Sequence, residues 1–97
     1  MQAVLSAISN PRRREILRLV WNRELSAGEI ASRFDISWPA VSQNLAVLRK
    51  AGLLSERRDA NRRLYRAEPA ALGSLRAPLE QMWAEDLTRL QEAVKRR

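Results

Sequence analysis

Residues 37–50 carry polar, small and basic side chains whose chemistry fits the edges of nucleic-acid bases. Gln43 has an amide that can pair with adenine N7 and N6, Ser42 a hydroxyl that tolerates close approach, and Ala46 a methyl suited to a thymine methyl. The stretch contains no acidic residue, although solvated helix faces usually carry Glu as well as Lys. The residue types therefore favour contact with DNA bases over an ordinary solvated surface.

A helix from about Ser37 to Gly52 must hold these side chains. Ser37 is a suitable N-cap, and Gly52 can adopt the left-handed conformation that ends a helix. At about 100° per residue, Val41, Leu45 and Leu48 form the buried stripe. Trp38 is left with two orientations, one packed against the preceding helix and one reaching DNA. The candidate DNA-binding residues of this helix are Ser37, Trp38, Pro39, Ser42, Gln43, Ala46, Arg49 and Lys50.

A second, shorter helix precedes this one. Ser26 and Glu29 have the spacing of a capping box, which predicts a helix over residues 27–34. Residues 35–37 then form a connection of three residues. The order of two capped helices and a tight turn predicts a helix-turn-helix over about residues 26–52.

A basic hairpin follows, with strands expected over residues 53–58 and 62–67. Asn61 is the residue expected to accept a positive φ in the turn. Four guanidinium groups near the tip are candidates for gripping the phosphate backbone or entering a minor groove. The alternative is an edge strand that charge protects from aggregation. The candidate DNA-binding residues of this wing, over about 53–67, are Arg57, Arg58, Arg62 and Arg63.

Helices are also predicted at both ends of the chain. A short one covers residues 4–8, and Asn10 with Pro11 begins another that runs to about Asn22. Apolar residues at intervals of three and four predict one long helix over about 69–96, with Pro78 either in its first turns or at a kink. A helix of about 30 Å exceeds what one small domain can cover. The alternative is a helix packed on its own core. The candidate dimer interface is Val4, Leu5, Ile8, Leu79, Met82, Trp83, Leu87, Leu90 and Val94.

The composition limits the remaining function classes. The 97 residues fit one domain, 1–97, and the net charge of +7 falls entirely within residues 1–67, where 13 basic residues face 6 acidic ones. Cysteine and histidine are absent, which removes the usual metal ligands and the commonest general base. No apolar run is long enough for a bilayer, and the N-terminus does not resemble a signal peptide. We expect a cytoplasmic, non-enzymatic protein without metal or cofactor.

The segments LSAISNPRRREILRLV, ELSAGEIASRFDIS, PAVSQNLAVLRKAGLLSERRD and RRLYR resemble the ArsR family of winged-helix transcriptional repressors. The resemblance implies a bacterial or archaeal homodimer, paired through its terminal helices, that blocks transcription at an inverted repeat. Asn44 stands where many relatives have histidine. Metal-sensing members have cysteines where Ser26 and Gly28 stand, so the resemblance implies a member without their metal sites.

The fold expected is mainly α with a small β-hairpin wing, a winged helix-turn-helix that dimerises through terminal helices. The function expected is sequence-specific binding of double-stranded DNA at a palindromic operator. A winged-helix module that binds proteins and has no DNA site is the competing interpretation. Catalysis would depend on carboxylates such as Glu80, Glu85 and Asp86, which the sequence pairs with no pocket.

Overall fold

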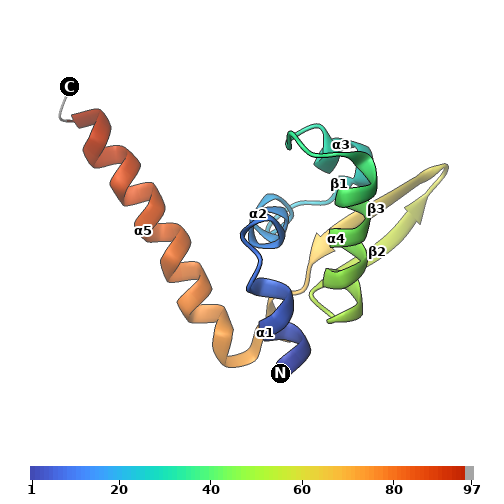
Figure 1. Ribbon diagram of the computed structural model, residues 1–97, viewed down its shortest axis with the longest axis horizontal. Helices are drawn as coiled ribbons and strands as arrows, with labels where there is room; N and C mark the ends of the chain where they lie inside the picture. Colours follow the sequence, from blue (N-terminus) through green and yellow to red (C-terminus); the bar gives the residue numbers. More distant parts are fainter. Residues whose placement is uncertain (96–97) are drawn as a thin grey trace.

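The computed structural model describes residues 1–95 and begins with two short helices, α1 (Gln2–Ile8) and α2 (Pro11–Leu19) (Figure 1). The Asn10 side chain accepts hydrogen bonds from the backbone amides of Arg12 and Arg13, at 2.8 and 3.4 Å. Pro11 follows at the first helical position, so the predicted helix start is confirmed. The helix ends three residues earlier than predicted, because Val20 leaves the helical conformation.

The helix-turn-helix consists of α3 (Ala27–Ala31) and α4 (Trp38–Lys50). The capping box is present: the Ser26 hydroxyl accepts from the Glu29 amide at 3.1 Å, and the Glu29 carboxylate accepts from the Ser26 amide at 3.0 Å. The prediction that this helix reaches Phe34 was wrong. The amides of Arg33 and Phe34 bond to carbonyls three residues back, which tightens the backbone into turns and lengthens the connection.

The bounds of α4 agree with the prediction at both ends. Ser37 caps it, with its hydroxyl accepting from the Ala40 amide at 3.3 Å. Gly52 follows with φ of +80°, the left-handed conformation that glycine adopts without strain. The predicted stripe of Val41, Leu45 and Leu48 is buried, so the rotation of α4 about its axis is fixed by core packing.

The wing is the hairpin of β2 (Leu54–Asp59) and β3 (Arg62–Ala67), to which the short strand β1 (Leu25–Ser26) adds in the order β1-β3-β2. Strand β1 was not predicted. The turn is also different, because Ala60 rather than Asn61 has the positive φ, +57°. Asp59 pairs with Arg62, which leaves a two-residue loop whose first position is left-handed, as in a type II′ turn.

The single terminal helix of the sequence prediction is two elements. A 3-10 helix (Pro69–Leu75) is interrupted at Gly73, with φ of +55°, and α5 (Arg76–Lys95) follows. Pro78 is the third residue of α5, where no intrahelical amide bond is lost. The predicted helix end at residue 96 lies outside the described residues.

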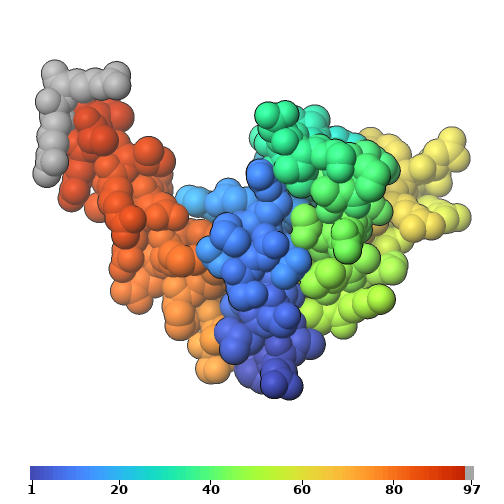
Figure 2. Space-filling model, in the orientation of Figure 1, coloured from blue at the N-terminus to red at the C-terminus, as the bar shows by residue number. Residues whose placement is uncertain are grey.

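The first half of α5 packs on the body and the second half leaves it (Figure 1). Trp83 packs edge-on against Trp21, with ring centroids 4.9 Å apart. Beyond Trp83, Leu87, Leu90 and Val94 are exposed. Figure 2 shows that this end of α5 and the wing project from opposite sides of the body. The molecule as a whole measures 46 Å along its longest axis.

Candidate nucleic-acid interface

The exposed face of α4 holds the predicted base-reading side chains. Ser42 and Gln43 are exposed and Ala46 is half-buried. Gln43 and Ala46 lie opposite the buried stripe, and Ser42 lies on one flank. Pro39, Arg49 and Lys50 are also exposed. The face therefore presents two hydrogen-bonding side chains beside small and basic ones, with no carboxylate within α4.

Trp38, at the first position of α4, is 56% exposed. The orientation that buried it against the preceding helix is thus excluded. A large indole in solvent at the start of this helix extends the apolar part of the face, next to the exposed Ser37 and Pro39.

One carboxylate joins α4 to the wing. Glu56 on β2 accepts a hydrogen bond from Arg49 at 2.7 Å and lies 3.5 Å from Arg63 on β3. Its side chain is 21% exposed, less than half the exposure of either arginine. The end of α4 and the base of the wing therefore share one fixed acidic group.

The register of the hairpin divides its four arginines between two faces. Arg58 pairs directly with Arg63, and both share a face with Glu56, the residue that contacts α4. Arg57 pairs with Leu64 and Arg62 with Asp59, so these two arginines lie on the opposite face. The four guanidinium groups expected together at one tip are not on one surface.

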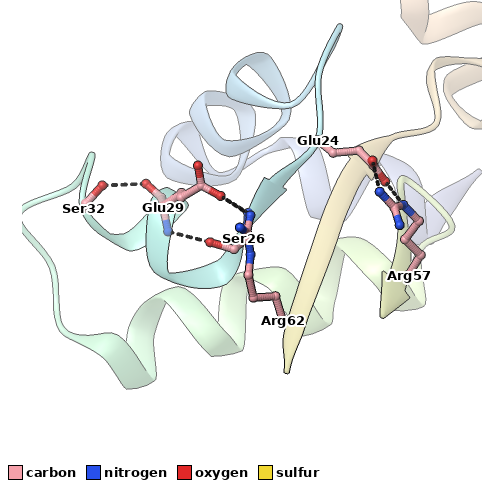
Figure 3. Close-up of polar contacts among 6 residues, drawn as sticks. All are labelled: Glu24, Ser26, Glu29, Ser32, Arg57 and Arg62. Carbon is pink, nitrogen blue, oxygen red and sulfur yellow. Dashed lines mark hydrogen bonds and ion pairs between the residues drawn. The ribbon is translucent and has the colours of Figure 1, made fainter. Parts of the chain in front are cut away.

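The two arginines of the far face are held by two carboxylates, Glu24 just before β1 and Glu29 on α3 (Figure 3). Arg57 donates to Glu24 through Nε and Nη2 at 2.8 and 2.9 Å, and Arg62 donates to Glu29 at 3.0 Å. The hydrogen bond from Arg57 lowers the pKa of the Glu24 carboxyl and raises the pKa of Arg57 itself. The pKa of Glu29 is lowered mainly by the Ser26 backbone amide, then by the Ser26 hydroxyl and the charge of Arg62.

Sequence reasoning missed these carboxylates as contacts of the wing. Glu29 was identified from its capping-box spacing, but its second role, the ion pair with Arg62, spans 33 positions. Glu24 and its partner are equally distant in the chain. Only the pairing of β1 with β3 brings them together, and a two-residue strand leaves no recognisable pattern in the sequence.

The expected dimer surface is only partly available. Within the protomer, Val4, Leu79 and Trp83 are each at most 8% exposed, because the first half of α5 packs on α1 and α2. These three are corrected to core residues. Leu5, Met82, Leu87, Leu90 and Val94 are exposed, and Ile8 is half-buried. A groove of about 310 Å³ between α1 and α5 is lined by residues that include Leu5, Ile8, Pro78 and Met82.

Comparison with known proteins identifies the family. Residues 10–56 match the family described as "Bacterial regulatory protein, arsR family". The HTH-type transcriptional regulator Rv2034 of Mycobacterium tuberculosis is 38% identical over 82 residues, which are 84% of this chain and 77% of that protein. The chain belongs to the ArsR family.

Two further relatives of this ArsR-family protein differ in their stated action. The transcriptional activator HlyU of Vibrio cholerae is 44% identical over 64% of this chain and 57% of its own length. The transcriptional repressor SdpR of Bacillus subtilis is 43% identical over 60% of this chain and 64% of its own length. The structure of reduced HlyU matches with a TM-score of 0.70 and 36% identity, over 82% of this chain and 81% of that one.

The family and the fold establish a DNA-binding transcriptional regulator rather than an enzyme, and a winged helix-turn-helix as predicted. Within residues 1–95 no helix has the length and apolar character to span a membrane. In the same residues no three acidic, Cys or His side chains gather into a metal-binding group. Ser26 uses its hydroxyl in the capping box, where it accepts from the Glu29 amide.

Proposed function

We propose that this ArsR-family protein binds an inverted repeat in double-stranded DNA as a homodimer, with one α4 in each major-groove half-site. The observation that carries the proposal is the exposed face of α4, where Ser42 and Gln43 stand on a helix without acidic residues. In helix-turn-helix proteins the N-terminal part of the second helix contacts base edges. That is the part of α4 where Trp38, Ser42 and Gln43 lie.

The residues of α4 divide by chemistry. Gln43 pairs with adenine, Ser42 allows close approach, and Ala46 contacts a thymine methyl. Trp38 packs against a sugar or a thymine methyl beside Ser37 and Pro39. Arg49 and Lys50, at the far end of the helix, contact phosphates and contribute affinity without sequence information.

The wing contributes phosphate contacts from the face that it shares with α4. Arg58 and Arg63 lie there by strand register, and they are the arginines assigned to the DNA backbone. Arg57 and Arg62 lie on the other face in ion pairs with Glu24 and Glu29. Their main role is to hold the wing against the helix-turn-helix, with phosphate contact secondary.

A second copy covers the apolar side chains that the protomer leaves exposed. The whole chain acts as one domain, and its dimer surface consists of Leu5, Ile8, Met82, Leu87, Leu90 and Val94. The exposed half of α5 has no other cover within residues 1–95. Two-fold symmetry then places half-site centres about 10 base pairs apart, or a multiple of that.

Repression in the cytoplasm is the action proposed, by occupation of a promoter and without a cofactor. Several relatives are named repressors, among them SdpR and a biofilm growth-associated repressor of Agrobacterium fabrum. HlyU is named an activator, so repression is tested separately from DNA binding. Transcription from the bound promoter in a purified system should fall as the protein is added, and a rise would reverse the assignment.

The proposal is tested by selecting genomic fragments with the purified protein at about 150 mM salt, where nonspecific phosphate contacts are weakened. Sequencing of the retained fragments should give an enriched inverted repeat. Retention without a common motif would reduce the activity to nonspecific DNA binding. No retention would favour a winged-helix module that binds proteins.

A further inference from the structure

One arginine connects three helices at the centre of the molecule. Arg13, on α2, donates from Nε to the Ala7 carbonyl at 2.6 Å and from Nη2 to the Ser6 carbonyl at 3.2 Å, both at the end of α1. Its Nη1 donates to Asn44 Oδ1 on α4 at 3.3 Å. Arg13 is half-buried, and its planar guanidinium can satisfy all three acceptors in one fixed geometry.

The first two bonds have a local explanation. The last carbonyls of a helix lack intrahelical partners, and a cation near them is favoured by the helix dipole. Arg14 also caps the end of α1, because its Nη1 donates to the Ile8 carbonyl at 2.7 Å. Within residues 1–95, however, Arg14 makes no hydrogen bond to α4, so capping of α1 does not account for the bond from Arg13 to Asn44.

The bond to Asn44 links the two surfaces on which the proposed function rests. Asn44 directly follows Gln43, the assigned base reader, and α1 carries Leu5 and Ile8 at the groove beside α5. In a dimer that joins through α1 and α5, the orientation of α4 relative to α1 decides how far apart the two reading helices stand. The DNA helical repeat then determines which half-site spacing fits.

We propose that Arg13 and Asn44 are positioning residues that fix the orientation of α4 relative to α1 and thereby set the half-site spacing that the dimer accepts. The inference rests on the proposed function for its DNA consequence, but the orientation itself exists in the free protomer. Neither residue needs to contact DNA. Removal of the Asn44 amide should relax the orientation while the stripe of Val41, Leu45 and Leu48 keeps α4 folded.

The orientation is measured first, without DNA. The chain has no cysteine, so Ala3→Cys on α1 and Lys50→Cys on α4, both exposed, accept two spin labels, and the labelled protein is diluted with unlabelled protein. Pulsed electron paramagnetic resonance should give a broader distance distribution in Asn44→Ala than in the parent. Arg14→Lys, the matched control, should keep the parent width, because it alters only the capping of α1. An unchanged width in Asn44→Ala would overturn the proposal.

The DNA consequence is measured on the selected operator, on versions with one base pair inserted or removed between half-sites, and on a duplex with one half-site. Asn44→Ala should lose about threefold to tenfold of its discrimination between spacings, the size expected for the net contribution of one ordinary hydrogen bond. Its affinity for the single half-site should stay near the parent value. Asn44→Asp, which keeps the acceptor, should retain the discrimination although its added charge weakens all binding.

The possible results separate the explanations. A loss of half-site affinity with unchanged spacing discrimination would show that Asn44 reads DNA directly, and it would overturn the positioning role. Equal loss of discrimination in Arg14→Lys would also overturn it, because capping of α1 would then be sufficient. If the parent protein prefers no operator, the proposed function fails, and the spin-label distances still decide whether Arg13 and Asn44 orient α4.

Discussion

Arg57 and Glu24 join the two outer strands of the sheet across its central strand. The guanidinium donates two hydrogen bonds to the carboxylate, at 2.8 and 2.9 Å, between residues 33 positions apart. Arg57 pairs in register with Leu64 of β3, and Glu24 directly precedes β1 on the other side of that strand. Leu64 is only 6% exposed although it is absent from the main core cluster. The ion pair therefore links the middle of the wing to the residue that precedes β1.

The division of the wing arginines predicts different effects for neighbouring substitutions. Arg58→Ala should weaken binding to specific and nonspecific DNA alike, and it should reduce the slope of log affinity against log salt by about one. Arg57→Ala, its matched control on the other face, should change that slope much less, because Arg57 is bound to Glu24. Fluorescence titrations at several salt concentrations measure both slopes. Equal slopes for the two variants would contradict the division.

The wing contacts also predict a dependence of stability on acid. The pKa values of Glu24 and Glu29 are lowered in the folded protein, so their contribution to its stability is complete above their ordinary pKa of 4.5. This contribution is lost as the pH falls below 4.5 and passes the lowered pKa values. A double variant, Glu24→Gln with Glu29→Gln, should lose less stability between pH 5 and pH 3 than the parent. Glutamine still supports a capping box, so the helix start is preserved.

Denaturant unfolding at a series of pH values makes the comparison. The remaining acidic residues titrate in both proteins, so only the difference between the two curves reports on the contacts of Glu24 and Glu29, which for Glu29 include the capping box. Parallel curves for the parent and the double variant would show that the two carboxylates do not stabilise the folded protein.

Gln43 is predicted to carry base discrimination. Gln43→Ala should cost about 1–3 kcal/mol at one operator position, the range for a lost bidentate pair with adenine. Binding to unrelated DNA should change little, because the substitution removes no charge. Competition titrations with single-base variants of the operator locate the position. Equal losses on operator and unrelated DNA would remove Gln43 from the base-reading set.

The two halves of α5 should respond differently to substitution. Trp83→Ala should destabilise the protomer by about 3 kcal/mol, as expected for a buried aromatic residue, because it removes the contact with Trp21. Leu90 is 64% exposed. Leu90→Glu should therefore give a monomer by sedimentation while the near-ultraviolet circular dichroism of the tryptophan pair is retained. A dimer of unchanged mass would place the interface elsewhere.

Local signals in the sequence predicted the helix starts and the buried face of α4. The caps at Asn10, Ser26 and Ser37 act within three residues, so a single sequence contains all the information they need. The three leucine and valine positions of α4 follow directly from helical geometry. Both strands of the wing were predicted as well, although β2 was placed one residue early and the positive φ was assigned to Asn61 rather than Ala60.

Features that depend on distant residues were not predicted. The ion pairs of Glu24 and Glu29 require the register of β1 against β3, and the division of the wing arginines requires the register of β2. Apolar spacing identified α5, but it could not separate Trp83, which the protomer buries, from Leu90, which it leaves exposed. Periodicity reports that a face is apolar and does not report what covers it.

The composition of the complex on a selected operator tests the central claim most directly. Its mass by analytical ultracentrifugation should correspond to two chains on one duplex. Methylation interference at guanine N7, which lies in the major groove, should mark two segments whose centres are about 10 base pairs apart, or a multiple of that. A complex of one chain per duplex, or one whose formation is insensitive to major-groove methylation, would contradict a dimer that reads DNA through α4.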